Sequence, residues 1–181
     1  MKLLNIIVCC DNKQGIGINN KLPWCNKSEM SLFKNKTIGK KNNCVIMGKN
    51  TYKSIPVKFF PLKNRKNIIL SSTMNKNDIK NENVIIYNTH YEIIEYIKNS
   101  NHDVYWIIGG AKIYEFFMNY YNKIISEIHI SFINHDYNCD QFFPKLDNSI
   151  FKLKETQIYN SFIHNIYVND KIIYDRNKDY H

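Results

Sequence analysis

A single carboxylate, Glu29, stands four residues before Phe33 in a segment that is expected to be helical. Residues four apart lie on one face of a helix, so the carboxylate and the aromatic ring would be neighbours. Such a pair could hold a flat heterocycle through paired hydrogen bonds, and desolvation would raise the carboxyl pKa. The alternative is that Glu29 only closes a capping box with Asn26, and the pattern alone favours this simpler interpretation.

Glu29 follows a loop rich in glycine and asparagine that also carries Leu22 and Trp24. Connecting loops often carry functional residues, and large apolar side chains so close to a carboxylate are typical of a lid. We therefore expect residues 15–33 to cover and line a ligand site.

Two glycine-containing turns between a strand and a helix could bind phosphate. Gly109-Gly110 follows one apolar strand, and Gly48-Lys-Asn-Thr51 follows another and adds a cation and a hydroxyl. Backbone N–H groups at a helix start attract anions, so two such turns suggest a ligand with more than one phosphate. A Gly-Gly pair is more often a plain tight turn, and the full Gly-x-Gly-x-x-Gly fingerprint of dinucleotide folds is missing.

Arg65 is one of only two arginines in the chain, the other being Arg176. Its planar guanidinium suits a substrate carboxylate, although an ordinary surface arginine is an equally good interpretation. The histidines show no metal-binding spacing, and no Ser/His/Asp or Cys/His constellation is evident. Metal-dependent and covalent catalysis are therefore disfavoured.

Apolar runs of strand length alternate with helical segments early in the chain and give way to a series of strands. Strands are expected at residues 3–10, 45–47, 67–70, 84–87, 104–108, 124–133, 151–159 and 162–168. Helices are expected to begin near Asn26, after Gly48, after the capping residue Thr89 and at Ala111. Only Asn160-Ser161 separates the last two strands, which favours an antiparallel hairpin.

This order of elements predicts an α/β fold with a mostly parallel sheet and an antiparallel end. In such sheets ligands bind outside the carboxyl ends of the strands. Those ends are expected at residues 11–24, 48–51, 71–73 and 109–112. Residues 58–66, between the second and third strands, are expected to form a basic loop.

Composition favours one globular, cytoplasmic domain, which we place at residues 1–181. The net charge of +9 is compatible with a polyanionic partner, but the basic residues are scattered, which favours a solvated surface. The five cysteines are odd in number and lack Cys-x-x-Cys spacing, which indicates reduced thiols. No signal peptide and no membrane-spanning run is evident.

Taken in order, these stretches resemble the dihydrofolate reductase family, and its eukaryotic members in particular. The matching stretches are Ile16-Gly17, Leu22-Pro-Trp24, Glu29 with Phe33, Val45-Ile-Met-Gly-Lys-Asn-Thr51, Ser54-Ile-Pro56, Pro61-Leu-Lys-Asn-Arg65, Asn67-Ile-Ile-Leu-Ser71, Ile108-Gly-Gly-Ala-Lys-Ile-Tyr114 and Asp140-Gln-Phe-Phe-Pro144. The resemblance covers nearly the whole chain. It implies the fold of that family, a central eight-stranded, mostly parallel sheet with an antiparallel C-terminal strand, flanked by about four helices.

The activity implied by the resemblance is NADPH-dependent reduction of 7,8-dihydrofolate to 5,6,7,8-tetrahydrofolate, which supplies one-carbon metabolism and thymidylate synthesis. A hydride passes to C6 of the pterin and a proton to N5. Antifolates such as methotrexate would bind at the same place. No metal, nucleic acid or membrane is implied, and the protein would be a monomer unless fused to thymidylate synthase, for which the tail at residues 170–181 could begin a linker.

The resemblance also carries roles to individual residues. In the catalytic machinery, Glu29 would bind the 2-amino and N3 edge of the pterin and favour protonation at N5, with the proton arriving through water; Leu22, Trp24 and Ser131 would assist it. The residues that would contact the substrate are Val8, Cys9, Leu22, Glu29, Met30, Phe33, Ile55, Leu62, Arg65, Ile108, Tyr114 and Ser131. The cofactor would be contacted by Cys9, Ile16, Gly17, Gly48, Lys49, Asn50, Thr51, Leu70, Ser71, Ser72, Thr73, Ile108, Gly109, Gly110, Ala111, Lys112, Ile113 and Tyr114.

Within these sets, Arg65 would pair with the glutamate α-carboxylate of the substrate. Lys49 with Ser71 or Ser72 would hold the 2′-phosphate that separates NADPH from NADH. Ser72 stands where vertebrate members carry an arginine, a departure from the family pattern that bears on recognition of this phosphate.

Two other functions compete with this one. A related pteridine or pyrimidine reductase, as in riboflavin synthesis, would share the fold but does not need the pairing of Glu29 with Arg65. A basic nucleic-acid-binding module would need clustered lysines and exposed stacking aromatics, whereas the aromatics here recur at core-facing positions.

Overall fold

The structure of the chain is a computed structural model that describes residues 3–40 and 42–172. Its strands are β1 (Leu3–Cys10), β2 (Gly15–Gly17), β3 (Asn43–Gly48), β4 (Arg65–Leu70), β5 (Val84–Tyr87), β6 (Val104–Ile107), β7 (Ile125–Phe132), β8 (Gln141–Phe142), β9 (Phe151–Tyr159) and β10 (Phe162–Asn169). Its α-helices are α1 (Lys27–Ile38), α2 (Lys49–Ser54), α3 (His90–Asn99) and α4 (Ala111–Tyr120), with short 3-10 turns at η1 (Val57–Phe59) and η2 (Asn122–Ile124).

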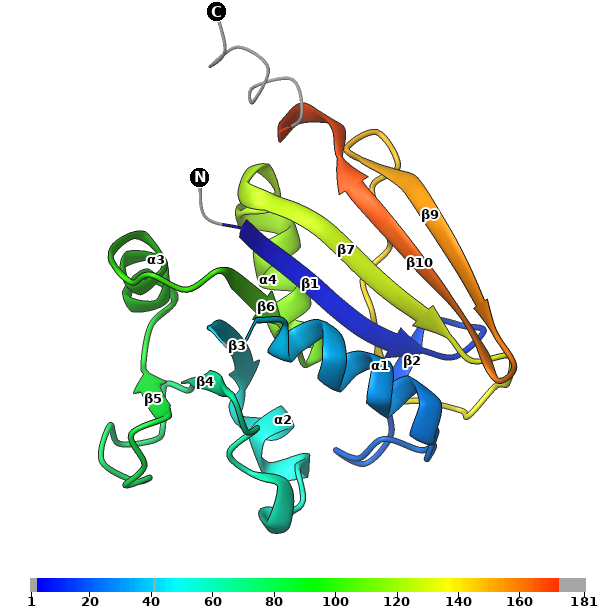
Figure 1. Cartoon of the computed structure of the whole chain (residues 1–181). Helices are drawn as coiled ribbons and strands as arrows, with labels where there is room; N and C mark the ends of the chain where they lie inside the picture. Colours follow the sequence, from blue (N-terminus) through cyan, green and yellow to red (C-terminus); the bar gives the residue numbers. More distant parts are fainter. Residues whose placement is uncertain (1–2, 41, 173–181) are drawn as a thin grey trace, which may run out of the picture.

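Eight of the strands form one sheet in the order β5-β4-β3-β6-β1-β7-β10-β9 (Figure 1). Neighbours from β5 to β7 pair in parallel, while β10 runs antiparallel to both β7 and β9. The predicted fold, including its antiparallel C-terminal strand and the hairpin between β9 and β10, is confirmed. Because the six strands from β5 to β7 in this order are parallel, their carboxyl ends share one edge of the sheet.

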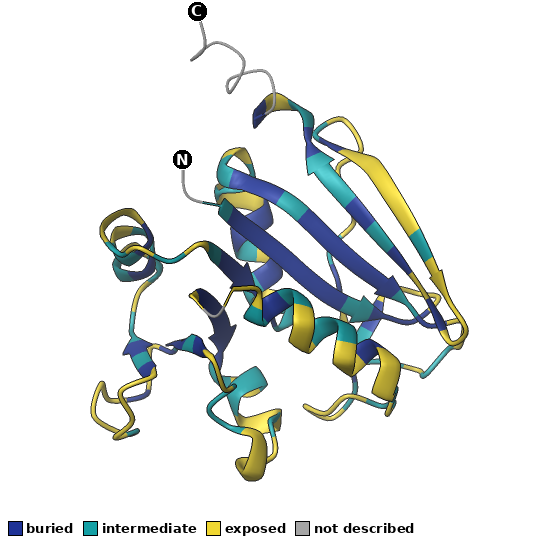
Figure 2. Ribbon diagram, viewed as in Figure 1, coloured by how far each residue is buried: buried dark blue, intermediate teal, exposed yellow. Residues whose placement is uncertain are grey.

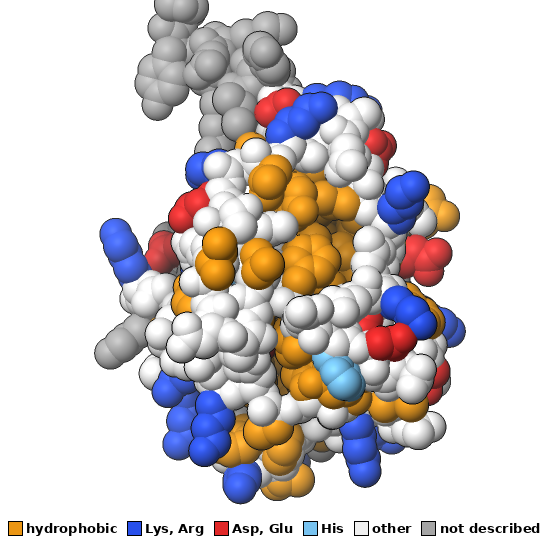
Figure 3. Space-filling model, turned by 90° about the vertical axis from the view of Figure 1, so that its right-hand side faces the viewer, with side chains coloured by type: hydrophobic (Ala, Val, Ile, Leu, Met, Phe, Trp, Pro, Cys, Tyr) orange, Lys and Arg blue, Asp and Glu red, His pale blue; other side chains and the backbone are white. Residues whose placement is uncertain are grey.

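Two apolar clusters cover the two faces of the sheet. On one face, side chains from α3 and α4 pack against the sheet around Ile6 and Phe117. On the other face, α1 and α2 lie over a second cluster that includes Ile7 and Met47. Strands β1, β3 and β7 are buried along most of their length, whereas β9 at the edge is largely exposed (Figure 2). Apolar side chains on β9 and β10 also reach the surface. Figure 3 shows apolar side chains gathered around a hollow on one face of the molecule.

The prediction that residues 58–66 form a basic loop is wrong in part. Residues 57–59 form η1, and β4 begins at Arg65, two residues before the predicted strand. The parallel ladder explains the earlier start, because Asn43 of β3 pairs with Arg65. The two-stranded sheet of β2 and β8 was not predicted, since elements of three and two residues are too short to show periodicity.

The tail predicted as a possible linker lies outside the described residues from residue 173 onward. Within residues 3–40 and 42–172, no helix has both the length and the apolar character needed to span a bilayer.

Candidate active site

Glu29 lies in the first turn of α1, on the face turned toward the sheet. Asn26 caps the helix, because its side chain accepts a hydrogen bond from the Glu29 backbone N–H at 3.1 Å. The Glu29 side chain is only 4% exposed, and its hydrogen-bond partner is the hydroxyl of Ser131 on β7. Only half of the expected capping box is therefore formed, and the carboxylate itself is turned inward.

Burial raises the pKa of the Glu29 carboxyl, and the hydrogen bond from Ser131 opposes part of that rise. Among the described residues, no cationic side chain forms an ion pair with this carboxylate. A buried carboxylate without a counter-charge is costly to keep, so it marks a place where a ligand can supply donors.

Helix α1 presents a stripe made of Glu29, Phe33 and Thr37, each four residues from the next. Phe33 is half-buried and packs against the second apolar cluster, together with three other residues that were predicted to contact substrate. These are Ile55, Leu62 and Ile108. The structure thus brings part of the predicted substrate set together as an apolar wall beside the carboxylate.

Arg65 begins β4 near the other end of that stripe. It is 7% exposed, and its Nη1 donates a hydrogen bond to Thr37 Oγ1 at 2.6 Å while its Nε donates to the Lys63 carbonyl. Burial lowers the pKa of the guanidinium to about 10, so it stays charged at neutral pH. In the described part of the chain no carboxylate pairs with it, which leaves donors for an outside anion.

Four other residues predicted to contact substrate are either buried on the α4 face or partly exposed. Val8 and Tyr114 belong to the apolar cluster on the α4 face, where the Tyr114 hydroxyl donates to the Ile7 carbonyl at 2.8 Å. Leu22 and Met30 are about half exposed, at 52% and 50%. Cys9 is half-buried near the end of β1.

The two glycine turns lie against each other at the carboxyl edge. The Gly48 backbone N–H donates to the Gly109 carbonyl at 2.7 Å. Gly109 has a φ of +107°, and a Cβ there would come within 3.0 Å of the Tyr114 ring. A Cβ on Gly110 would lie 3.3 Å from Thr51 Oγ1. Side chains are therefore kept away from this edge, which lets a ligand approach the backbone closely.

A pocket of about 480 Å³ opens beside these turns. Lys49 lines it and donates a hydrogen bond to Thr73 Oγ1 at 2.6 Å, and no described carboxylate pairs with this lysine. The Ser71 hydroxyl accepts hydrogen bonds from the backbone N–H groups of Thr73 and Met74. The remaining lining residues are Leu70, Ser72, Asn88, Thr89, His90 and Tyr91.

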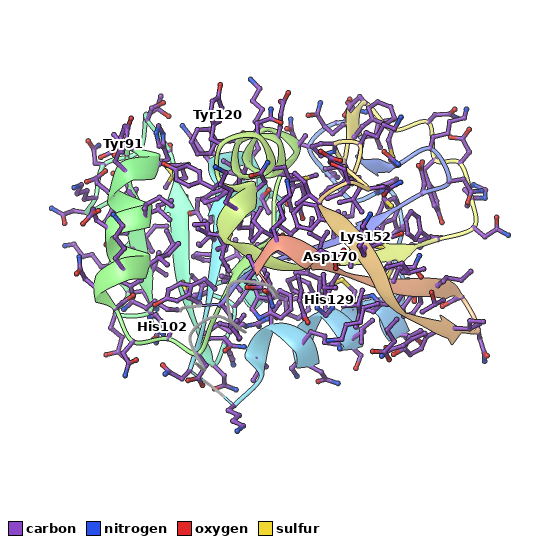
Figure 4. All side chains as sticks on the ribbon, turned by 90° about the horizontal axis from the view of Figure 1, so that it is seen from above. Tyr91, His102, Tyr120, His129, Lys152 and Asp170 are labelled. Atoms are coloured by element: carbon purple, nitrogen blue, oxygen red, sulfur yellow. The ribbon has the colours of Figure 1, made fainter. Side chains whose placement is uncertain are left out.

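The last four residues of that lining, residues 88–91, were not predicted. They follow β5, which pairs in parallel with β4, so its carboxyl end reaches the same edge as residues 71–73. The rule that ligands bind at carboxyl ends would have identified them had it been applied to this strand as well. Figure 4 shows Tyr91 at the start of α3.

Hydrogen bonds hold the first residues of the predicted lid, and a later residue of the lid is bonded to α2. Asp11 is buried and accepts hydrogen bonds from the backbone N–H groups of Lys13, Gly15 and Tyr137. The Trp24 ring lies 5.2 Å from the Tyr137 ring, centroid to centroid. Farther along the same edge, Asn50 Nδ2 of α2 donates to Asn20 Oδ1 at 3.2 Å. Ile16 and Gly17 lie in β2, which β8 pairs with.

Sequence reasoning missed a buried polar cluster behind Ser131. Ser131 Oγ lies 3.0 Å from His164 Nδ1, and His164 Nε2 lies 3.2 Å from His129 Nδ1. His129 Nε2 lies 3.0 Å from Glu127 Oε2. We call Ser131, His164, His129 and Glu127 the β7–β10 chain. Three of its members alternate along β7 and so face one side of the sheet, which is the signal the sequence contained. Within residues 3–40 and 42–172, no three His, Cys, Asp or Glu side chains are grouped in a way that could hold a metal ion.

Comparison with known proteins places the sequence of this chain in a family. The family model described as dihydrofolate reductase matches residues 3–176. The dihydrofolate reductase of Heliothis virescens is 37% identical over 165 residues, covering 87% of this chain and 86% of that protein. The dihydrofolate reductase of Drosophila melanogaster is 34% identical, covering 82% of this chain and 83% of that protein.

The chain is also similar to one part of longer proteins. The bifunctional dihydrofolate reductase-thymidylate synthase of Plasmodium chabaudi is 33% identical over 211 residues, covering 96% of this chain. The chain spans only 36% of the length of that relative.

Proposed function

The chain belongs to the dihydrofolate reductase family, and from that membership we propose that it reduces 7,8-dihydrofolate to 5,6,7,8-tetrahydrofolate with NADPH. The product would serve one-carbon metabolism and thymidylate synthesis. We take residues 1–181 as a single catalytic domain that acts in the cytoplasm, as a monomer unless it is fused to a synthase.

One observation carries the proposal: the buried groups Glu29 and Arg65 lie at the two ends of one helix face, and neither has an ion-pair partner within residues 3–40 and 42–172. Glu29 and Thr37, which holds Arg65, are eight residues apart on α1. At a rise of about 1.5 Å per residue, they are separated by about 12 Å along the helix axis. Phe33 lies between them on an apolar wall. This spacing suits a ligand with a flat, hydrogen-bonding ring at one end and a carboxylate at the other.

Glu29 would accept hydrogen bonds from the 2-amino group and N3 of the pterin. Its desolvated carboxylate gains from these donors because no described cation neutralises it. Negative charge on that edge of the ring favours protonation at N5. The carboxylate binds the opposite edge of the ring from N5, so the proton itself would arrive through water.

Arg65 would fix the other end of the substrate. A guanidinium presents two parallel N–H groups to a carboxylate, and Arg65 is already oriented by Thr37 and by the Lys63 carbonyl. Orientation before binding reduces the entropy lost when substrate docks. The same surface would bind antifolates such as methotrexate, which carry a similar ring and tail.

The residues at the carboxyl edge fit a nicotinamide dinucleotide. Gly109 and Gly110 present backbone without side chains at a place where a Cβ would crowd Tyr114 and Thr51, and Lys49 offers a positive charge in the pocket that it lines. Lys49 with Thr73 and Ser71 would hold the 2′-phosphate, and the glycine turns would hold the pyrophosphate. When bound there, NADPH supplies the reducing equivalent that is delivered to C6.

The proposal is tested by following NADPH absorbance when dihydrofolate is added to the purified chain. We expect absorbance to fall in proportion to the dihydrofolate supplied, and not to fall with NADPH alone. A well-folded protein that leaves NADPH unchanged, or that consumes it only with a ribitylamino-pyrimidine substrate, would contradict the proposal.

A further inference from the structure

The β7–β10 chain continues from the site carboxylate to the far end of β7. Its first member, Ser131, is the hydrogen-bond partner of Glu29, and its last member, Glu127, lies four residues earlier on the same strand. Both histidines are nearly inaccessible, with exposures of 3% for His129 and 0% for His164. His129 lies on the face of the sheet that α1 covers (Figure 4). The reaction proposed above uses none of the three residues beyond Ser131.

The charges within the chain are constrained by its surroundings. The hydrogen bond from His129 and the nearby Lys154 lower the pKa of Glu127 to about 2, despite partial burial, so this end is ionised. Burial lowers the pKa of His164 to about 4, so its ring is neutral. A neutral imidazole donates from one nitrogen and accepts at the other. Whether His164 donates to Ser131 or accepts from it therefore decides whether it accepts from His129 or donates to it.

Two arrangements satisfy every hydrogen bond in the chain. In the first, Glu29 is protonated and donates to Ser131, and Ser131 donates to His164 Nδ1. His164 Nε2 then donates to a neutral His129, whose other nitrogen donates to Glu127. In the second, Glu29 is ionised, the bonds from Glu29 to His129 reverse, and His129 carries the extra proton next to Glu127.

Other proton counts leave a mismatched contact. With no extra proton and both carboxylates ionised, two acceptors face each other within the chain. With an extra proton on both Glu29 and His129, two N–H groups oppose each other between the histidines. Either mismatch at 3.2 Å in a buried site costs the hydrogen bond and leaves polar groups unpaired.

We propose that the β7–β10 chain shares a single proton between Glu29 and His129. In the transfer, the Glu29 O–H bond breaks as its proton goes to Ser131 Oγ. The original Ser131 hydroxyl proton passes to His164 Nδ1, and the His164 Nε2 proton passes to His129 Nδ1. Three bonds to hydrogen break and three form, no electron is gained or lost, and the carboxylate charge on Glu29 appears together with an imidazolium charge on His129.

The charged groups around the middle and far end of the chain come from α1 and β9. Lys36 on α1 and Glu155 on β9 act on His164 with opposite charges. Lys154 on β9 holds the second oxygen of Glu127 at 3.3 Å. This ion pair keeps Glu127 in place as the partner of an imidazolium.

The groups around Glu29 and His129 do not compete for the proton. Burial raises the pKa of the Cys9 thiol on β1 and of the Tyr114 hydroxyl on α4, so both are neutral at the pH of the reaction. The Trp106 ring packs edge-on against His129 at 5.0 Å between centroids. The chain is thus separated from water on its β6 side by an aromatic ring.

The consequence for catalysis rests on the proposed function. Glu29 must be ionised to accept hydrogen bonds from the pterin, although burial favours its protonated form. The chain gives the displaced proton a buried position and returns it when the ring leaves. His164, His129 and Glu127 are positioning residues that set the charge of Glu29 through Ser131.

The test measures the Glu29 carboxyl carbon and the His129 ring nitrogens by NMR in the absence of substrate and cofactor. Glu127→Gln removes the counter-charge of the imidazolium. The proton should therefore move onto Glu29, and its ratio of protonated to ionised forms at neutral pH should rise about tenfold, equivalent to one pKa unit. A through-space effect has the opposite sign, because loss of a negative charge favours an ionised Glu29.

Two further variants make the assignment to the chain specific. Introducing Glu127→Gln into a His164→Phe background should no longer raise protonation of Glu29. Ser131→Ala removes only one oxygen atom and breaks the β7–β10 chain at its other end. It should also abolish the effect of Glu127→Gln, and it replaces His164→Phe as the background if that variant does not fold. The matched control is Glu155→Gln, a carboxylate beside His164 but outside the chain, which should show only the through-space sign.

An unchanged or more ionised Glu29 in Glu127→Gln would overturn the proposal, as would an effect that persists after either break. Since no substrate is present, this result is independent of the reductase assay. A protein that fails to oxidise NADPH but shows the expected effect of Glu127→Gln on Glu29 would contradict the proposed function. It would still support the sharing of a proton along the β7–β10 chain.

Discussion

Arg65 and Thr37 join β4 to α1 through a hydrogen bond of 2.6 Å between the guanidinium Nη1 and the hydroxyl Oγ1. Both side chains are buried, with exposures of 7% and 0%. The same guanidinium has no carboxylate partner among the described residues. A buried cation that is oriented by neutral groups is available to an anionic ligand without first breaking an ion pair.

Replacing Arg65 should therefore weaken substrate binding more than it affects the chemical step. For Arg65→Ala we expect kcat/KM for dihydrofolate to fall about 100-fold, because a desolvated, two-pronged charge pair is lost. Steady-state kinetics should assign most of the loss to KM. Arg65→Lys keeps the charge without the fork and should recover only part of it. For a substrate that lacks the glutamate tail, kcat/KM should be the same in the original protein, Arg65→Ala and Arg65→Lys. If kcat/KM for that substrate falls as far as it does for dihydrofolate, Arg65 does not recognise the tail.

Lys49 should distinguish NADPH from NADH. In Lys49→Ala the loss of one charge-assisted hydrogen bond to the 2′-phosphate should narrow the ratio of kcat/KM values for the two cofactors about tenfold. Kinetics with NADPH should worsen while kinetics with NADH stay close to those of the unmodified protein. Lys53→Ala, an exposed lysine on the same helix, is the matched control. An unaltered ratio would show that the phosphate is held elsewhere.

Glu29→Gln should lose most of its activity at neutral pH, by about 100-fold or more, since it removes the charge that favours protonation at N5. Part of the activity should return in acid, where the substrate is protonated before it binds. The measurement is kcat as a function of pH for both proteins. The same pH profile in both would separate Glu29 from the proton step, whatever its effect on binding.

Asp11 should matter for the stability of the lid rather than for the reaction. Burial alone raises its pKa, but hydrogen bonds from the backbone N–H groups of Tyr137, Gly15 and Lys13 bring the pKa below its ordinary value of 3.8. Asp11→Asn should lower the free energy of unfolding by about 2 kcal/mol, because hydrogen bonds to a charged acceptor are lost in a buried site. Urea unfolding at neutral pH measures this difference.

The pH dependence of that stabilisation follows from the direction of the pKa shift. A carboxyl whose pKa is lowered by folding stabilises the protein above its unfolded pKa, and the contribution disappears as the pH falls through the folded pKa. The difference between the original protein and Asp11→Asn should therefore be full at neutral pH and shrink below about pH 4. A constant difference down to acid pH would mean that the ionised carboxylate is not what holds residues 13, 15 and 137.

The sequence alone determined the local elements and the chemistry available to them. The continuous apolar run of β1, the capping pattern at Thr89 and the two-residue turn Asn160-Ser161 each depend on neighbours within a few positions, so their signals lie in one short window. The collinear motifs with Glu29, Lys49 and Arg65 gave the family. These features are readable because side-chain periodicity and turn chemistry are local properties of the chain.

Only the tertiary structure decided which distant side chains meet. Ser131 and His164 are paired across β7 and β10, and their contact depends on a strand register that no local pattern specifies. The sequence motif around Tyr114 likewise does not indicate its partner, because the Tyr114 hydroxyl donates a hydrogen bond to the carbonyl of the distant residue Ile7. Glu29 shows both levels at once: its backbone N–H bonds to the cap that the sequence predicts, while packing of α1 on the sheet turns its carboxylate toward Ser131.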